Sequence, residues 1–189
     1  MKKNALVWLL LSICFSLNAQ TITELLNKAD QYEKQIKEED AYNAYKEVLK
    51  ADSRHLLSLI KCSELASRIG KRQLDKATSI DFYNAAKVYA QRALTVDSTS
   101  DEANCVMAIA MGRMALVSSG KEKVINVREI KRFADAALKY NPNSYKAWHI
   151  LGKWNFEVNN LNIIERAAIK LLYGGVPPAS IENAIKFYE

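Results

Sequence analysis

Hydrophobic and polar residues follow one another along this chain with the period of amphipathic α-helices. Three stretches share one spacing of small and large apolar residues, closed by Ser or Pro. They are Ala41-x3-Tyr45-x2-Val48-x4-Ser53, Ala86-x3-Ala90-x2-Ala93-x4-Ser98 and Ile130-x3-Ala134-x2-Ala137-x4-Pro142. Positions three and four apart lie on one helix face, where small residues let a neighbouring helix approach closely. The pattern therefore predicts three similar helices, each followed by a turn.

The three stretches repeat at steps of 45 and 44 residues, and a fourth copy begins at Ala184. A second helical pattern follows each of the first three turns, and an opening copy fits the chain from Thr21 onward. Self-similarity at a fixed period is the sequence signature of a solenoid, in which stacked helix pairs share a continuous core. We therefore predict an all-α fold: an α-solenoid of about three and a half antiparallel helix pairs over residues 21–189, with a period of about 45.

The pattern resembles the tetratricopeptide repeat (TPR), most clearly in Trp148-x2-Leu151-Gly152 preceded by Asn141-Pro142. A standard TPR takes 34 residues, so each step here is 10 or 11 residues longer. We place the surplus between the helices of each pair, around residues 70–73, 120–123 and 174–178, either as longer helices or as an extra turn in the loops. The residues assigned to the repeat signature are Ala41, Tyr45, Ala86, Ala93, Ala137, Pro142, Trp148, Leu151 and Gly152.

A narrower resemblance rests on the strings at 120–131, 151–154 and 171–180, which are similar to the regulator of microtubule dynamics family. It extends over most of the chain after residue 20. It implies a TPR-like helical domain of a kind often associated with mitochondria or endoplasmic reticulum, and a lipid-carrying role for at least one relative. The N-terminus differs from that of the eukaryotic members, so the resemblance does not carry the family's name over as a function.

Residues 1–20 match a secretory signal peptide. Lys2 and Lys3 precede an apolar run over residues 5–17, and the small residue Ala19 follows it. The run is shorter than the roughly 20 residues that a membrane-spanning helix needs. A lipoprotein signal ending at Cys14 and an uncleaved anchor are the alternatives. We predict export to the periplasm or cell envelope of a Gram-negative-type bacterium.

The helical pattern at the C-terminal end of the sequence is incomplete. The last helical pattern begins near Ser180 and lacks its closing Ala and Pro, and no polar capping helix follows it. Solenoids generally need such a cap for solubility. We therefore expect further C-terminal sequence, or a partner that covers this end.

Composition and motifs favour a binding protein over an enzyme. The net charge of +6 falls to +4 without Lys2 and Lys3, which is too mild to indicate nucleic-acid binding. Neither histidine has a Ser, Cys or Asp at catalytic spacing, and HExxH, Walker and GxGxxG motifs are absent from the sequence. We expect no catalysis, no metal and no cofactor. Cys62 and Cys105 are either a disulfide or, as their isolated positions favour, two buried small hydrophobes.

The remaining candidate is the concave face that the first helices of stacked pairs line. Its mixed apolar and basic character suits a peptide whose carboxylate meets Arg or Lys. The alternative is an acyl chain on the apolar floor with an anionic head group at the cations. The alternative for each of these side chains is that it fills a gap between helices and binds nothing. The predicted ligand-binding residues are Leu57, Ile60, Arg68, Cys105, Ile109, Arg113, His149 and Lys153.

Overall fold

The computed structural model describes residues 22–187, and every regular element among them is an α-helix. This confirms the all-α prediction, while the predicted signal peptide lies outside the described residues and stays a prediction. The helices are residues 22–34, α2 (Glu38–Ala51), α3 (Leu56–Arg72), α4 (Lys76–Val96), α5 (Asp101–Val117), α6 (Gly120–Tyr140), α7 (Tyr145–Asn159), α8 (Ile163–Tyr173) and α9 (Ile181–Lys186).

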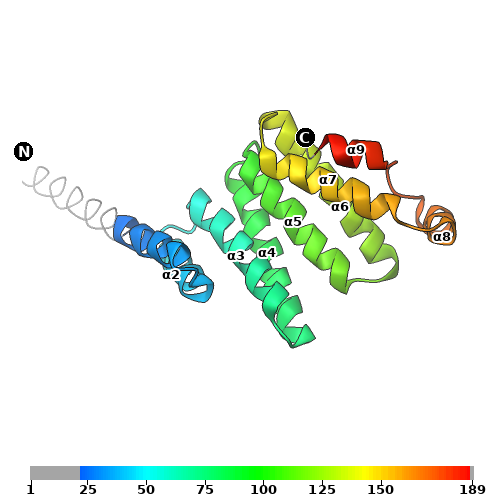
Figure 1. The fold of residues 1–189 in the computed structure, drawn as a ribbon. Coiled ribbons are helices and arrows are strands. Elements are labelled where there is room, and N and C mark those ends of the chain that lie inside the picture. Colours follow the sequence, from blue (N-terminus) through cyan, green and yellow to red (C-terminus); the bar gives the residue numbers. More distant parts are fainter. Residues whose placement is uncertain (1–21, 188–189) are drawn as a thin grey trace, which may run out of the picture.

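The helices stack as antiparallel pairs along a solenoid (Figure 1). From α2 to α7, each helix packs on the next along the chain. α5 also contacts α3 and α7, whereas α4 and α6 make no comparable contact with each other within residues 22–187. The odd-numbered helices therefore lie closer together than the even-numbered ones and form the inner side of the solenoid.

Each turn between repeats is built by a side chain immediately before the Ser or Pro of the sequence pattern. These residues occupy equivalent positions one repeat apart, end the preceding helix and accept a hydrogen bond from the backbone N–H two residues on, as in an Asx turn. They are Asp52, Asp97 and Asn141, with N···O distances of 2.9, 2.8 and 3.1 Å. The turn residues thus recur with the same period as the apolar residues.

Hydrogen bonds also connect the turn of one repeat with the next repeat along the chain. The Arg92 guanidinium donates to the carbonyl of Ser53 at 2.8 Å, and the Asn141 amide donates to the Asp101 carboxylate at 2.8 Å. Both bonds connect positions 39 or 40 residues apart in the chain. They hold one repeat in register with the next at the edge of the solenoid.

The surplus residues of the long period lie in the helices. α3 and α5 have 17 residues each, and α4 and α6 have 21. Only residues 73–75 and 118–119 connect the helices within these two pairs. Of the two alternatives left by the sequence, longer helices are therefore the one observed, and the predicted connectors around Gly70 and Gly120 belong to helix ends.

The third pair departs from this scheme because α8 is inserted before the helix that packs on α7. α9 takes the pairing position against α7. α8 packs on α6 instead, and its Arg166 guanidinium donates to the carbonyls of Val158 and Asn159 at the end of α7. The Arg128 side chain of α6 donates to the carbonyls of Tyr173 and Gly175, with an Nε···O distance of 2.9 Å to Gly175. Gly174 closes α8 in the left-handed conformation at φ 76°, which glycine adopts without strain.

The core is made by small residues that allow close helix contacts. The signature alanines Ala41, Ala86, Ala93 and Ala137 are completely buried, and Leu151 is nearly so. Of the tryptophans, Trp154 is buried and donates to the Val127 carbonyl at 2.8 Å. Trp148, one of the repeat-signature residues, is half-buried, with its ring 5.3 Å from that of Phe187.

Candidate functional site

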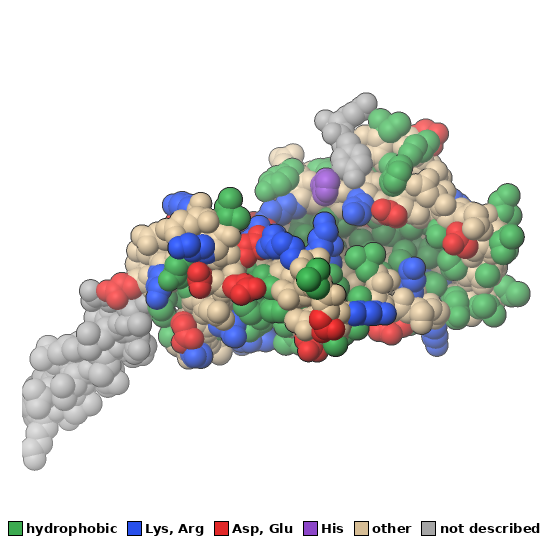
Figure 2. Space-filling view, turned by 60° about the horizontal axis from the view of Figure 1, so that its bottom comes forward, with side chains coloured by type: hydrophobic (Ala, Val, Ile, Leu, Met, Phe, Trp, Pro, Cys, Tyr) green, Lys and Arg blue, Asp and Glu red, His purple; other side chains and the backbone are tan. Residues whose placement is uncertain are grey.

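The inner side of the solenoid is formed by α3, α5 and α7, which carry the predicted ligand-binding residues. Residues four apart on one helix lie on the same face. Ile109 and Arg113 of α5 therefore form one row, and His149 and Lys153 of α7 form the row beside it. Figure 2 shows Lys and Arg side chains gathered around the hollowed middle of the molecule.

At the N-terminal end of this face the cations are paired with carboxylates. Glu33 accepts hydrogen bonds from Lys61 at 2.9 Å and from the Tyr45 hydroxyl at 2.6 Å. The Arg68 guanidinium lies 3.3 Å from the Glu38 carboxylate and 3.9 Å from that of Glu33. Arg68, predicted to meet a ligand, is thus committed to internal ion pairs.

Glu38 of α2 is the carboxylate that neutralises the arginines at this end of the face. Its side chain is only 11% exposed and is shared between Arg68 and Arg72 of α3. Removing one partner of a buried ion pair leaves the other charge uncompensated, which costs more than the pair contributes. This cluster therefore joins α2 to α3 as a structural element. No local sequence pattern predicts it, because its members come from three helices.

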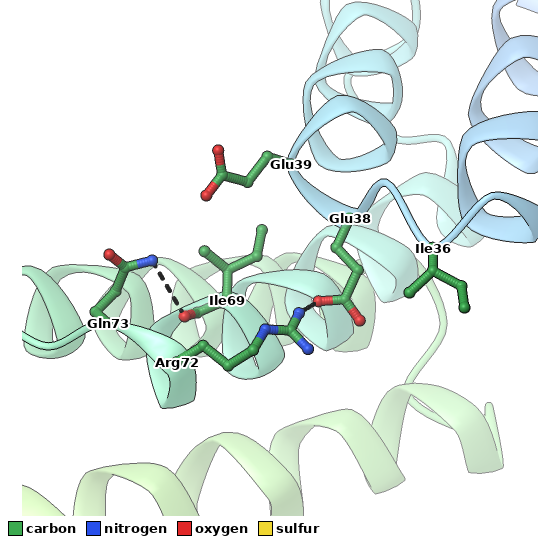
Figure 3. Close-up of a pocket in the computed structure, with 6 residues that line it drawn as sticks. All are labelled: Ile36, Glu38, Glu39, Ile69, Arg72 and Gln73. Carbon is green, nitrogen blue, oxygen red and sulfur yellow. Dashed lines mark hydrogen bonds and ion pairs between the residues drawn. The ribbon is translucent and has the colours of Figure 1, made fainter.

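A pocket of about 400 Å³ lies between the start of α2 and the end of α3 (Figure 3). Glu38 and Arg72 pair with each other in it, and Ile69 packs beside them. Ile36 at its rim is 81% exposed and has a positive φ of 60°, a conformation that β-branched residues rarely adopt. Its one cation, Arg72, is already neutralised by Glu38, so the pocket is not the better candidate for binding an acidic ligand.

Lys146 of α7 forms an ion pair across the inner face. Its Nζ lies 3.5 Å from the carboxylate of Glu102 on α5. Burial disfavours the charged ammonium, but the carboxylates of Glu64 and Glu102 outweigh it and raise the pKa of Lys146 above its ordinary value. This lysine stays charged and is used to connect α7 with α3 and α5.

Beyond Lys146 the face carries two cations that the fold does not neutralise. Arg113 is half-buried, and its Nε is shielded from solvent without a hydrogen-bond partner within residues 22–187. Lys153 is exposed and makes no ion pair with any described residue. Ile109 is half-buried, and the exposed His149 lies on the same face of α7 as Lys153. These four residues, Ile109, Arg113, His149 and Lys153, are named here the inner basic patch.

The other predicted contact residues are divided between core and surface. Ile60 and Cys105 are buried at 3% and 0% exposure and belong to the core, so the prediction that they line the ligand surface is corrected. The prediction failed because α3 and α5 pack more tightly against their neighbours than a surface register assumes. Leu57 is 44% exposed at the start of α3 and remains accessible.

Both described cysteines are free, buried thiols. Burial raises the pKa of Cys62 to about 12 and that of Cys105 to about 11. The Cys105 Sγ lies 3.8 Å from the buried Ser144 hydroxyl. Of the two alternatives from the sequence, small buried hydrophobes match this arrangement.

Two further observations bear on the class of site. Across residues 22–187, no group of three or more His, Cys, Asp or Glu side chains is arranged to hold a metal ion. None of the described helices combines the length and apolar character needed to cross a membrane.

Comparison with solved structures supports the TPR-like architecture. The first TPR domain of Spaghetti (RPAP3) bound to the HSP90 peptide SRMEEVD superposes with a TM-score of 0.57 at 17% identity, covering 74% of this chain and 94% of that one. The MamA protein superposes with a TM-score of 0.57 at 20% identity, covering 89% of this chain and 74% of that one. At these identities the likeness shows the fold alone.

Sequence comparison identifies the family. Regulator of microtubule dynamics protein 1 of Caenorhabditis elegans is 27% identical over 124 residues, which is 66% of this chain and 53% of the relative. The protein of the same name from Bos taurus is 26% identical over 169 residues, or 88% and 52%. This chain thus spans about half the length of these relatives. Residues 25–189 match the model of the regulator of microtubule dynamics protein 1-3 family, and the chain belongs to that family.

Proposed function

We propose that this protein is a non-catalytic scaffold that binds an extended acidic peptide or protein segment on the inner basic patch. The single observation that carries the proposal is the pair of uncompensated cations, Arg113 and Lys153, on adjacent inner helices. A guanidinium offers a fork of N–H donors that matches a carboxylate, and an ammonium adds a second positive charge.

The distribution of ion pairs selects the place of binding. Lys61, Arg68 and Lys146 are neutralised by Glu33, Glu38 and Glu102, so an incoming acid would have to displace an internal partner there. At Arg113 and Lys153 no such displacement is needed. We therefore expect a ligand carboxylate to bind most favourably on the α5–α7 side of the inner face.

A structural relative gives a precedent for this mode of binding. The RPAP3 TPR domain is described as bound to the peptide SRMEEVD, which is acidic and ends in Asp. A similar arrangement here would lay an extended chain along the inner helices with its acids at the inner basic patch. Ile109 and Leu57 would supply apolar contact beside it.

Lipid binding in the same groove has less support. The apolar floor required by an acyl chain included Ile60 and Cys105, which are both core residues. Two pockets, of about 400 and 210 Å³, lie against α2, and charged residues contribute to the lining of both. Ligand pockets for apolar molecules are predominantly apolar and enclosed.

The test is a peptide array in which the same extended sequences are displayed in acidic, neutral and basic versions. We expect the protein to select acidic peptides, and the Arg113→Glu/Lys153→Glu variant to bind the selected peptides at least about tenfold more weakly. Hydrogen bonds to charged groups contribute about 1.5–3 kcal/mol each, and about 1.4 kcal/mol is tenfold in affinity.

Lys87→Glu is the matched control, because Lys87 is an exposed lysine on α4, outside the inner helices. It changes the net charge in the same direction without altering the patch. Selection without regard to acidity, or an equal loss in the Lys87 variant, would show that the inner basic patch is not the binding site.

A further inference from the structure

One side of α8 is an apolar stripe that no other part of the described chain covers. Ile163 and Leu171 are both 85% exposed, Ile164 is 80% and Leu172 is 64%. Ala167 and Ala168 lie between them on the same side of the helix and are also exposed. No residue of α8 is buried. A helix in a soluble domain normally directs such a stripe into the core, and an uncovered one marks an interaction surface.

The stripe faces away from the rest of the domain. Ile169 and Tyr173, on the opposite side of α8, are the half-buried residues, and the Tyr173 hydroxyl approaches Gly120 at the start of α6. Figure 1 places α8 at one end of the solenoid, and Figure 2 shows hydrophobic side chains gathered at that end. The helix is therefore held by its inner side, by Arg128 and by the bonds of its own Arg166 to the end of α7, while its apolar side projects outward.

The excess positive charge of the described chain lies in the same part of the molecule. Residues 22–117 contain 14 Lys and Arg against 14 Asp and Glu, whereas residues 118–187 contain 11 against 6. Lys170 on α8 is exposed, as are Lys121 and Lys123 at the start of α6, the end that the Tyr173 hydroxyl approaches. Glu165 is used within α8, where it accepts from the Asn162 backbone in the capping box.

We infer that α8 docks on an anionic lipid surface, with its apolar stripe set among the lipid head groups. Helices that lie in a membrane interface combine an apolar face with Lys and Arg on the flanks and are drawn to anionic lipids. α8 has the apolar face, Lys170 lies on its flank, and Lys121 and Lys123 lie at the neighbouring start of α6. At 11 residues α8 is far shorter than the roughly 20 needed to span. Because the stripe projects outward and exposed lysines lie near it, an anionic lipid surface suits it better than a folded partner. This surface is separate from the inner basic patch, so the inference goes beyond the proposed function.

Hydrogen exchange of the full chain tests the docking at α8 itself. The backbone amides of residues 163–173 are followed by mass spectrometry with vesicles of phosphatidylcholine alone and of phosphatidylcholine mixed with phosphatidylglycerol. A peripheral helix with few contacts opens readily, and docking slows that opening. We expect at least tenfold slower exchange in α8 on the mixed vesicles only, with no change in α3 and α4, and a smaller effect at high salt.

The test variant is Leu171→Glu/Leu172→Glu, which alters only exposed side chains and should fold normally. It should abolish the slowing in α8. Leu74→Glu changes an equally exposed leucine in the loop after α3 and should leave the slowing intact. Circular dichroism checks that both variants keep their helices.

Three results would overturn the inference. The first is unchanged exchange in α8 on mixed vesicles, and the second is equal slowing in the Leu171/Leu172 variant. The third is a solution dimer that this variant converts to a monomer, with no lipid effect in α8, because the stripe would then be an interface between two copies. Failure of the peptide array leaves these outcomes unaffected, since Arg113 and Lys153 are not altered.

Discussion

Gly70 lies where α3 crosses α4, and the packing there leaves no room for a side chain. A Cβ at this position would come within 2.8 Å of the Phe82 Cβ and 2.9 Å of a Tyr83 ring carbon. Tyr83 is itself buried, so its ring has little freedom to withdraw. The close approach of the two long helices therefore depends on the absence of one methyl group.

We expect Gly70→Ala to lower the free energy of unfolding by about 1–3 kcal/mol, the usual cost of overpacking a core. Thermal or urea denaturation followed by circular dichroism measures it. Gly112→Ala is the matched control in α5, because its Cβ would meet only the Ile130 Cδ1 at 3.8 Å. That variant should be neutral or more stable by about 0.5–1 kcal/mol, since alanine favours helix over glycine. An equal loss in both variants would contradict the close-approach argument.

At the scale of the elements, long helices and an inserted helix distinguish this solenoid from one with a 34-residue repeat. α4 and α6 have 21 residues each, and they pack on the 17-residue helices α3 and α5 that precede them. α8 is the exception, because it buries no residue and polar contacts attach it to the solenoid. Arg128 of α6 binds the carbonyls at its C-terminal end, and its own Arg166 binds carbonyls at the end of α7.

Arg128→Ala should loosen α8 without unfolding the solenoid. Bonds to a charged donor contribute about 1.5–3 kcal/mol, so we expect at least about tenfold faster amide exchange in residues 163–173. Faster proteolysis near Gly174 should accompany it. Arg132→Ala, which removes an exposed partner of Glu129 on the same helix, should leave α8 unchanged. Unaltered exchange in the Arg128 variant would mean that other contacts hold the helix.

For the whole molecule, the burial of weakly acidic groups couples stability to alkaline pH. Burial raises the pKa of Cys62 from 9.0 to about 12 and of Cys105 from 9.0 to about 11. It also raises the pKa values of Tyr42 and Tyr45. A group that holds its proton more tightly when folded stabilises the fold below its unfolded pKa, and this contribution is lost as pH rises toward the folded value.

The protein should therefore lose stability progressively between about pH 9 and pH 12. Urea denaturation at several pH values measures the slope. Replacing both thiols, in Cys62→Ala/Cys105→Ala, should make the decline shallower, even though the variant starts from lower stability because two core side chains are smaller. A decline of the same steepness in the variant would assign the alkaline loss to the tyrosines and other groups.

The sequence by itself determined the helical class and the repeat step, because both depend on local periodicity, and it indicated the family through particular strings of residues. Alanine spacing and the turn residues recur along the chain at 45 and 44 residues, and α2, α4 and α6 end at Ala51, Val96 and Tyr140 with those same steps. The signature residues that the pattern selected are largely buried as expected. Asp52, Asp97 and Asn141, which form the Asx turns, recur with the same periodicity, each directly before the closing Ser or Pro.

Only the tertiary structure decided which inner-face residues are accessible and which charges are satisfied. Arg68 and Arg113 occupy matching positions in successive repeats, yet Glu33 and Glu38 neutralise the first and no described carboxylate neutralises the second. Pairing across helices depends on how separate segments meet, which local spacing does not encode. The exposed stripe of α8 could not be predicted for the same reason. Its apolar pattern is that of a core helix, and only the tertiary structure shows that no described neighbour covers it.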